Sequence, residues 1–198
     1  MPVQKHLLGL RRALAAFALL PAAAAQTAGL PPEWETRKLL ADFSAQVERL
    51  KPLLDKVNPE SWLAAGAPEA YVAQWKATRK EADYLIRSAE ILSEQPEKLT
   101  AALDVLFRTQ IFESMLLSLA DGVRRYQNPA VAQLLAGVNS ENAENREKLR
   151  QYVIDLAAVK EQELAAMDKE AQRCRQMLMR PSSAPRPAPR PVPKEARK

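Results

Sequence analysis

Apolar residues in this chain recur in steps that alternate between three and four positions, and this spacing constrains the fold more than any other feature of the sequence. The first series consists of Leu40, Phe43, Val47, Leu50, Leu54 and Val57. Such steps place side chains along one face of an α-helix and match the seam of a coiled coil. Similar series follow from residue 68, from residue 97 and from residue 129. The spacing predicts an all-α fold, an elongated up-and-down bundle of about four main helices.

Prolines predict where the helices begin and end. The pairs Asn58-Pro59 and Asn128-Pro129 each combine an N-cap residue with proline at the first helical position. Pro52 interrupts the first series on the face opposite its seam, so we expect a kink there rather than a helix end.

From Pro129 to about Met179 no proline interrupts the chain. The sequence leaves two possibilities open for this long, coiled-coil-like stretch. It is one continuous helix, or it breaks between Gly137 and Ser140, where Asn139 or Ser140 would cap a new helix. In both cases the last helix is longer than the others.

The distal half of this helix carries its own seam and has no obvious partner in the chain. The seam consists of Val153, Ala157, Leu164, Met167, Ala171, Cys174 and Leu178, with Lys160 as the one charged interruption. An apolar stripe left in water is unfavourable, so we expect a second copy, another protein or the start of the first helix to cover it. The alternative is that the bundle is longer than these boundaries suggest and that the stripe is ordinary core.

Polar residues interleave near the possible break. Asn142 and Asn145 continue the seam, where polar side chains can set helix register and partner choice, and the alternative is a simple exposed stretch at a helix break. Beside them Glu141, Glu144 and Glu147 follow one strip of the helix. Three carboxylates on a strip could bind a divalent cation, but the many charges around them favour a solvated face.

The first 25 residues have the pattern of a secretory signal peptide. Lys5, Arg11 and Arg12 precede an apolar run, and an alanine string ends in an Ala-x-Ala step at Ala23 and Ala25. We therefore expect an exported protein, periplasmic or secreted, that is cleaved near Ala25. The longest apolar run is well short of the roughly 18 to 20 residues needed to span a bilayer, so we expect no transmembrane segment in the mature chain.

The pattern divides the rest of the chain into three parts. Residues 26–32 form a flexible lead, residues 33–179 the helical bundle domain, and residues 180–198 a basic tail in which proline alternates with other residues. Alternating proline favours extended polyproline II or disorder. The cations of the tail could touch anionic envelope polymers, and the alternative is a solvated spacer.

Composition excludes many kinds of chemistry. The one histidine, His6, lies in the presequence, which removes histidine-based catalysis and histidine-ligated metals from the mature chain. Glycine is too scarce for a phosphate-binding loop. The net charge of +5 comes from the two ends, because residues 26–178 hold 20 basic and 23 acidic residues. A nucleic-acid-binding face is not indicated, and we expect no cofactor and no metal site.

Two other features could bear on function. Cys174, the one cysteine, lies between two arginines and predicts either an intermolecular disulfide, a free thiol or a small buried side chain. Trp34, Trp62 and Trp75 could form a ligand pocket with nearby tyrosines, although packing is the more common role of such residues.

These observations favour a non-enzymatic binding protein, an interaction or scaffold protein of the cell envelope. One alternative is a chaperone-like or inhibitor protein that binds apolar segments of other exported proteins. Another is an enzyme that uses only carboxylate, lysine or tyrosine side chains, which would require a buried carboxylate pair in a pocket.

Overall fold

The computed structural model describes residues 29–179, and within this range the chain folds into helices joined by short turns. The elements are α1 (Glu33–Asp55), α2 (Pro59–Trp62), the 3-10 turn η1 (Leu63–Ala65), α3 (Ala70–Glu94), α4 (Leu99–Tyr126), α5 (Pro129–Glu141) and α6 (Ala143–Met179). The all-α prediction is confirmed. The predicted signal peptide, residues 26–28 of the lead and the basic tail lie outside the described residues.

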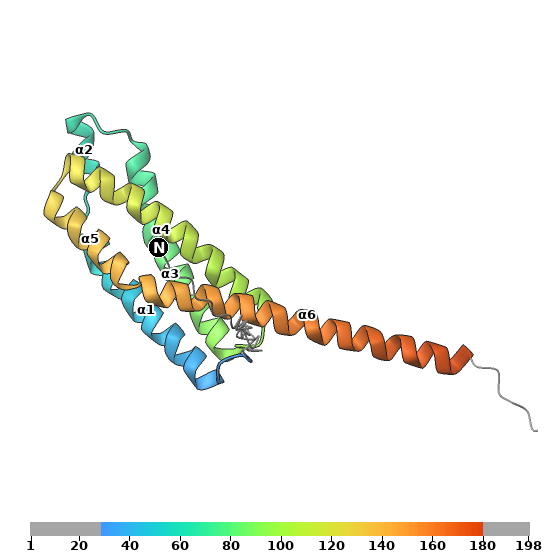
Figure 1. Cartoon of the computed structure of the whole chain (residues 1–198). Coiled ribbons are helices and arrows are strands. Elements are labelled where there is room, and N and C mark those ends of the chain that lie inside the picture. Colours follow the sequence, from blue (N-terminus) through green and yellow to red (C-terminus); the bar gives the residue numbers. More distant parts are fainter. Residues whose placement is uncertain (1–28, 180–198) are drawn as a thin grey trace, which may run out of the picture.

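Four helical rods form the bundle: α1, α3, α4, and a fourth made of α5 and the start of α6. The chain passes up and down between them (Figure 1). Helix α1 packs against α3, α3 against α4, and α4 against α5 and the first part of α6, which close the ring on α1. The fourth rod is thus built from two helices. Beyond the bundle α6 continues as a single projecting helix (Figure 1).

The predicted apolar seams form the core. All six residues of the first series are buried, and so are most residues of the corresponding apolar series on α3 and α4. Burial of such side chains stabilises the fold by about 1.5 to 3 kcal/mol each. On α4 the flanking residues Phe107 and Ile111 are about half exposed, so this helix is not enclosed on all sides.

Aromatic packing and one glutamine hold the α2 end of the bundle together. Trp62 stacks on Tyr126 at 6.0 Å between ring centroids and meets Tyr71 edge-on at 5.6 Å. A Cβ on Gly122 would lie 2.7 Å from the Tyr71 ring, so the close approach of this ring to α4 requires glycine. The Gln127 side chain accepts hydrogen bonds from the Trp62 indole at 3.1 Å and from the Asn58 backbone amide at 3.0 Å, and donates to the Lys56 carbonyl.

The predicted helix starts are confirmed, and the last stretch follows neither of the two alternatives left open by the sequence. The side chains of Asn58 and Asn128 cap α2 and α5 as expected, and α1 continues through Pro52 without ending. The long last stretch does break, but at Asn142 and not between Gly137 and Ser140. Neither Asn139 nor Ser140 caps the new helix, because Asn139 lies inside α5 and is buried against the core.

Candidate functional site

The first four turns of α6 anchor this helix to the bundle. Leu149, Tyr152, Val153 and Leu156 are buried there. The Tyr152 hydroxyl donates a hydrogen bond to the Pro96 carbonyl in the turn between α3 and α4. After Lys160 the helix has left the bundle.

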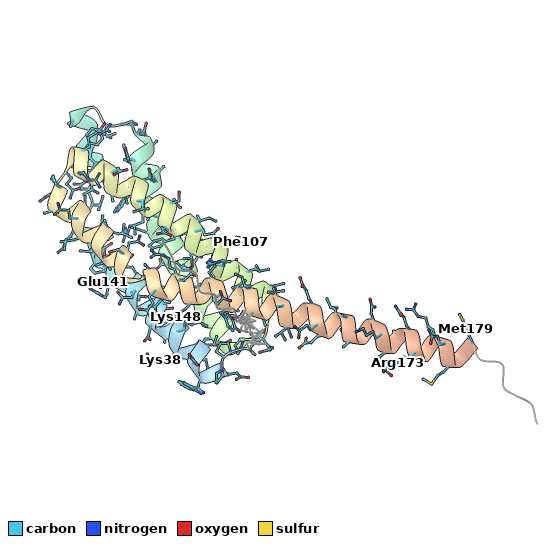
Figure 2. All side chains as sticks on the ribbon, in the orientation of Figure 1. Lys38, Phe107, Glu141, Lys148, Arg173 and Met179 are labelled. Atoms are coloured by element: carbon cyan, nitrogen blue, oxygen red, sulfur yellow. The ribbon has the colours of Figure 1, made fainter. Side chains whose placement is uncertain are left out.

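Residues 161–179, here called the free segment, extend from the bundle into solvent (Figure 2). Every residue in it is exposed except Ala171, which is half-buried. At 1.5 Å per residue the free segment is about 28 Å long. It keeps an apolar stripe of five residues in helical register: Leu164, Met167, Ala171, Cys174 and Leu178. Leu164 is 61% exposed, Met167 60% and Leu178 86%.

The predicted seam is therefore divided between two environments. Val153 is buried in the chain's own bundle and Ala157 is half-buried, whereas the other five residues form the exposed stripe. The alternative that the seam is ordinary core of a longer bundle is wrong for these five residues. None of the other described helices extends far enough along α6 to cover them. Helix α1 begins at Glu33 and does not cover them either.

Charge changes sign along the free segment. Its first two turns carry Glu161 and Glu163, and its last two carry Arg173 and Arg175. Asp168, Lys169 and Glu170 lie between these ends. Within the helix Glu163 pairs with Lys160 at 3.0 Å and Glu170 pairs with Arg173 at 3.7 Å, and both pairs are largely exposed to solvent. The free segment is thus acidic near the bundle and basic toward its tip, where Figure 2 shows Arg173 and Met179.

A polar cluster joins four helices where α5 meets α6. The Arg146 guanidinium donates to the Asn139 carbonyl at 2.7 Å and pairs with Glu113 of α4 at 3.0 Å. Asn142, predicted to set register, is buried and donates to the Phe43 carbonyl of α1 at 3.4 Å. Asn145 is half-buried and donates to the Asn142 side chain at 3.0 Å. The two asparagines lie at the helix break and at the base of α6, away from the free segment.

The acidic strip Glu141, Glu144 and Glu147 does not converge on a shared site. Glu141 pairs with Arg49 of α1, Glu144 with Lys148 at 2.7 Å, and Glu147 with Arg150. The neighbouring cation lowers the pKa of the Glu144 carboxyl, and Arg150 does the same for Glu147. Lowered values keep these groups ionised, which disfavours proton donation near neutral pH. Among residues 29–179 no cluster of acidic or cysteine side chains is suited to hold a metal ion.

The three tryptophans do not come together in one ligand pocket. Trp62 is part of the aromatic packing described above, and the Trp75 indole donates to the Leu54 carbonyl at 2.8 Å. Trp34 is exposed at the start of α1, whereas Trp62 lies beyond the other end of that helix. Cys174 is a free and exposed thiol.

A hollow of about 540 Å³ lies between the start of α1 and the base of α6. Trp34 and Tyr152 line it together with charged side chains of both signs, including Lys38, Lys148 and Asp155. Lys38 and Lys148 lie on this side of the molecule in Figure 2. The mixed charges select no particular class of ligand.

Sequence reasoning missed the pairing of Arg146 with Glu113 and the role of Gln127. Glu113 is an acid among mainly apolar residues in the apolar helix α4, and such a residue signals that a cation faces it from another element. Arg146 is the only cation in the first turn of α6 that could face it, and its spacing from Asn139 gave no sign of the pairing, because the helix break between them sets their relative position.

Replacing Tyr152 by phenylalanine tests how α6 is anchored. Loss of the hydrogen bond to Pro96 is expected to lower the free energy of unfolding by about 1 kcal/mol near neutral pH. Burial raises the pKa of the Tyr152 hydroxyl, and Glu97 and Glu33 add to the rise. The neutral phenol therefore stabilises the fold fully below the unfolded-state pKa of about 10, and this contribution is lost as pH rises through the raised pKa.

Urea unfolding of both proteins between pH 7 and 11 measures this effect. The stability difference between wild type and Tyr152→Phe should shrink above about pH 10. A difference that stays constant with pH would contradict burial of an ionisable hydroxyl, because the other tyrosines are common to both proteins.

None of the described helices combines the length and the apolar character that crossing a membrane requires. Comparison of the chain with protein-family models, with curated proteins and with solved structures finds no match.

Proposed function

We propose that this chain is an exported, non-enzymatic binding protein and that the free segment of α6 is its docking surface for another polypeptide. The observation that carries the proposal is the apolar stripe on a helix that has left its own bundle, with Leu164 and Met167 about 60% exposed. The signal-peptide pattern of the first 25 residues supports the exported location.

Exposed leucine and methionine side chains at helical spacing are suited to bind a partner helix. Each gains about 1.5 to 3 kcal/mol when it is fully buried, and an apolar helix face laid against a second apolar surface is a common mode of recognition. The charged residues on both sides of the stripe would limit which partners fit. The bundle would then act as the support that presents α6.

Site-specific photocrosslinking tests the docking surface. A photoreactive residue at Met167 should form adducts with another polypeptide in the exported fraction of cells that produce the full chain, and mass spectrometry would identify that polypeptide. The same photoreactive residue placed at Ala166, which is exposed but lies outside the stripe, is the matched control. Adducts should be abundant at 167 and scarce at 166.

A charged substitution within the stripe should abolish these adducts. Leu164→Glu in the Met167-labelled chain removes an apolar contact, whereas Ala165→Glu adds the same charge outside the stripe. Adducts should be lost in the first and kept in the second. Equal labelling at 166 and 167, or no adduct at either position, would contradict a docking surface on the free segment.

A further inference from the structure

The occupant of the stripe can be identified further, if the proposed function holds. We infer that it is a second copy of this chain, whose free segment pairs antiparallel along residues 160–178. Three independent features of the described residues support this pairing: the position of the bundle relative to the stripe, the order of charges, and the order of side-chain sizes.

The bundle excludes a parallel pair. Val153 lies on the same seam as the stripe, and it is buried against the chain's own bundle. The bundle therefore lies on the seam side of α6, just before the free segment begins. In a parallel pair both bundles would lie at the same level and on the facing sides of the two helices, where they would occupy the same space. Because α6 projects away from its own bundle (Figure 1), each bundle of an antiparallel pair would lie beyond the tip of the other helix.

The charges at the two ends of the free segment are complementary only in the antiparallel direction, whereas Asp168 and Glu170 near its centre face each other in this pairing. The end that carries Glu161 and Glu163 then lies along the end of the second copy that carries Arg173 and Arg175, of which Arg175 flanks the stripe. A parallel pair would place two acidic ends together and two basic ends together. Opposite charges that flank an apolar seam select helix orientation and register.

Side-chain sizes set the register. When the two helices overlap along all of residues 160–178, Leu164 lies opposite the second copy's Cys174, and Met167 lies opposite its Ala171. Leu178 lies opposite Lys160, whose aliphatic stem can cover it while the amine reaches water. Each layer thus pairs a large side chain with a small one or with a flexible stem. A parallel register would pair Ala171 with alanine and Lys160 with lysine, leaving a gap and a repulsive layer.

Disulfide trapping distinguishes the orientations in the full purified chain. In the antiparallel register the two Cys174 residues are about 15 Å apart along the axis, too far for a disulfide, so oxidised wild type should remain unlinked. Leu164→Cys, which keeps the native thiol, should give a covalent dimer through Cys174 of the second copy. Leu164→Cys with Cys174→Ser should not, and neither should Ala165→Cys with the native thiol.

Leu164→Cys removes an apolar contact and therefore weakens the pair that it reports on. Light scattering of the reduced wild type tests the pair without that change. Wild type and Cys174→Ser should both have the mass of a dimer, and Leu164→Glu with Met167→Glu should be a monomer. Disulfide linkage in wild type or in the Leu164→Cys, Cys174→Ser variant would show a parallel pair and overturn the inference.

A wild-type chain that stays monomeric would also overturn it. If photocrosslinks at Met167 to a different polypeptide persist in that case, the docking surface stands and only its occupant is wrong. If those crosslinks are absent as well, both the inference and the proposed function fail.

Discussion

Replacing Trp62 by alanine is expected to lower the free energy of unfolding by about 3 to 5 kcal/mol. The indole is 1% exposed and packs between the rings of Tyr71 and Tyr126. Its removal leaves a cavity between the turn after α1 and the end of α4, and it also leaves one acceptor site on Gln127 unused. In a domain of this size such a loss lowers Tm by roughly 2 to 4 °C for each kcal/mol. Thermal unfolding followed by far-UV circular dichroism measures it.

Trp34→Ala is the matched control, since it removes the same side chain from an exposed position at the start of α1. Its effect should stay within about 0.5 kcal/mol. Similar losses in the two variants would contradict the burial of Trp62 and the assignment of the α2 end as a packed core.

Replacing Arg146 by methionine is expected to cost about 2 kcal/mol of folding free energy. The variant keeps an unbranched side chain of similar helix propensity, but it removes the bonds to the Asn139 carbonyl and to Glu113. Breaking a fully buried ion pair costs about 3 to 5 kcal/mol, and the value here is lower because a third of the Glu113 side chain remains in contact with water. Urea unfolding near neutral pH measures the change.

Arg150→Met provides the comparison on the same helix. Arg150 pairs with Glu147 on the solvent side, where an ion pair contributes little to stability. This variant should unfold like wild type. An equal loss in both would mean that the methionine side chain, and not the cluster at the break, causes the effect.

Most of the bundle could be predicted from the sequence because local rules decide it. The spacing of Leu40, Phe43 and Val47 fixes which face of α1 is buried, and the Asn-Pro pairs fix where α2 and α5 begin. These signals act within one or two helical turns.

The position of the break could not be predicted because contacts between helices decide it. Gly137 and Ser140 are poor helix residues and suggested a break there, yet α5 continues past both. The helix ends at Asn142, whose side chain reaches the Phe43 carbonyl of α1, while Arg146 satisfies the Asn139 carbonyl. Packing of this kind overrides local propensity, and no spacing rule reports it.

The stripe was visible in the sequence, but its exposure was not. Val153 and Leu164 fit the same heptad pattern equally well, and only the lengths of the other helices decide that one is buried and the other exposed.

Because α6 is one uninterrupted helix from Ala143 to Met179, its base and its tip share a single rotational phase. Each residue turns the helix by about 100°, so inserting one residue between Leu156 and Leu164 would rotate the stripe by more than a quarter turn relative to the bundle. The last buried anchor, Leu156, lies about 35 Å from the tip at 1.5 Å per residue. A tilt of only 10° at the anchor would displace the tip by about 6 Å over that arm, so side chains that never touch a partner determine where the stripe is presented.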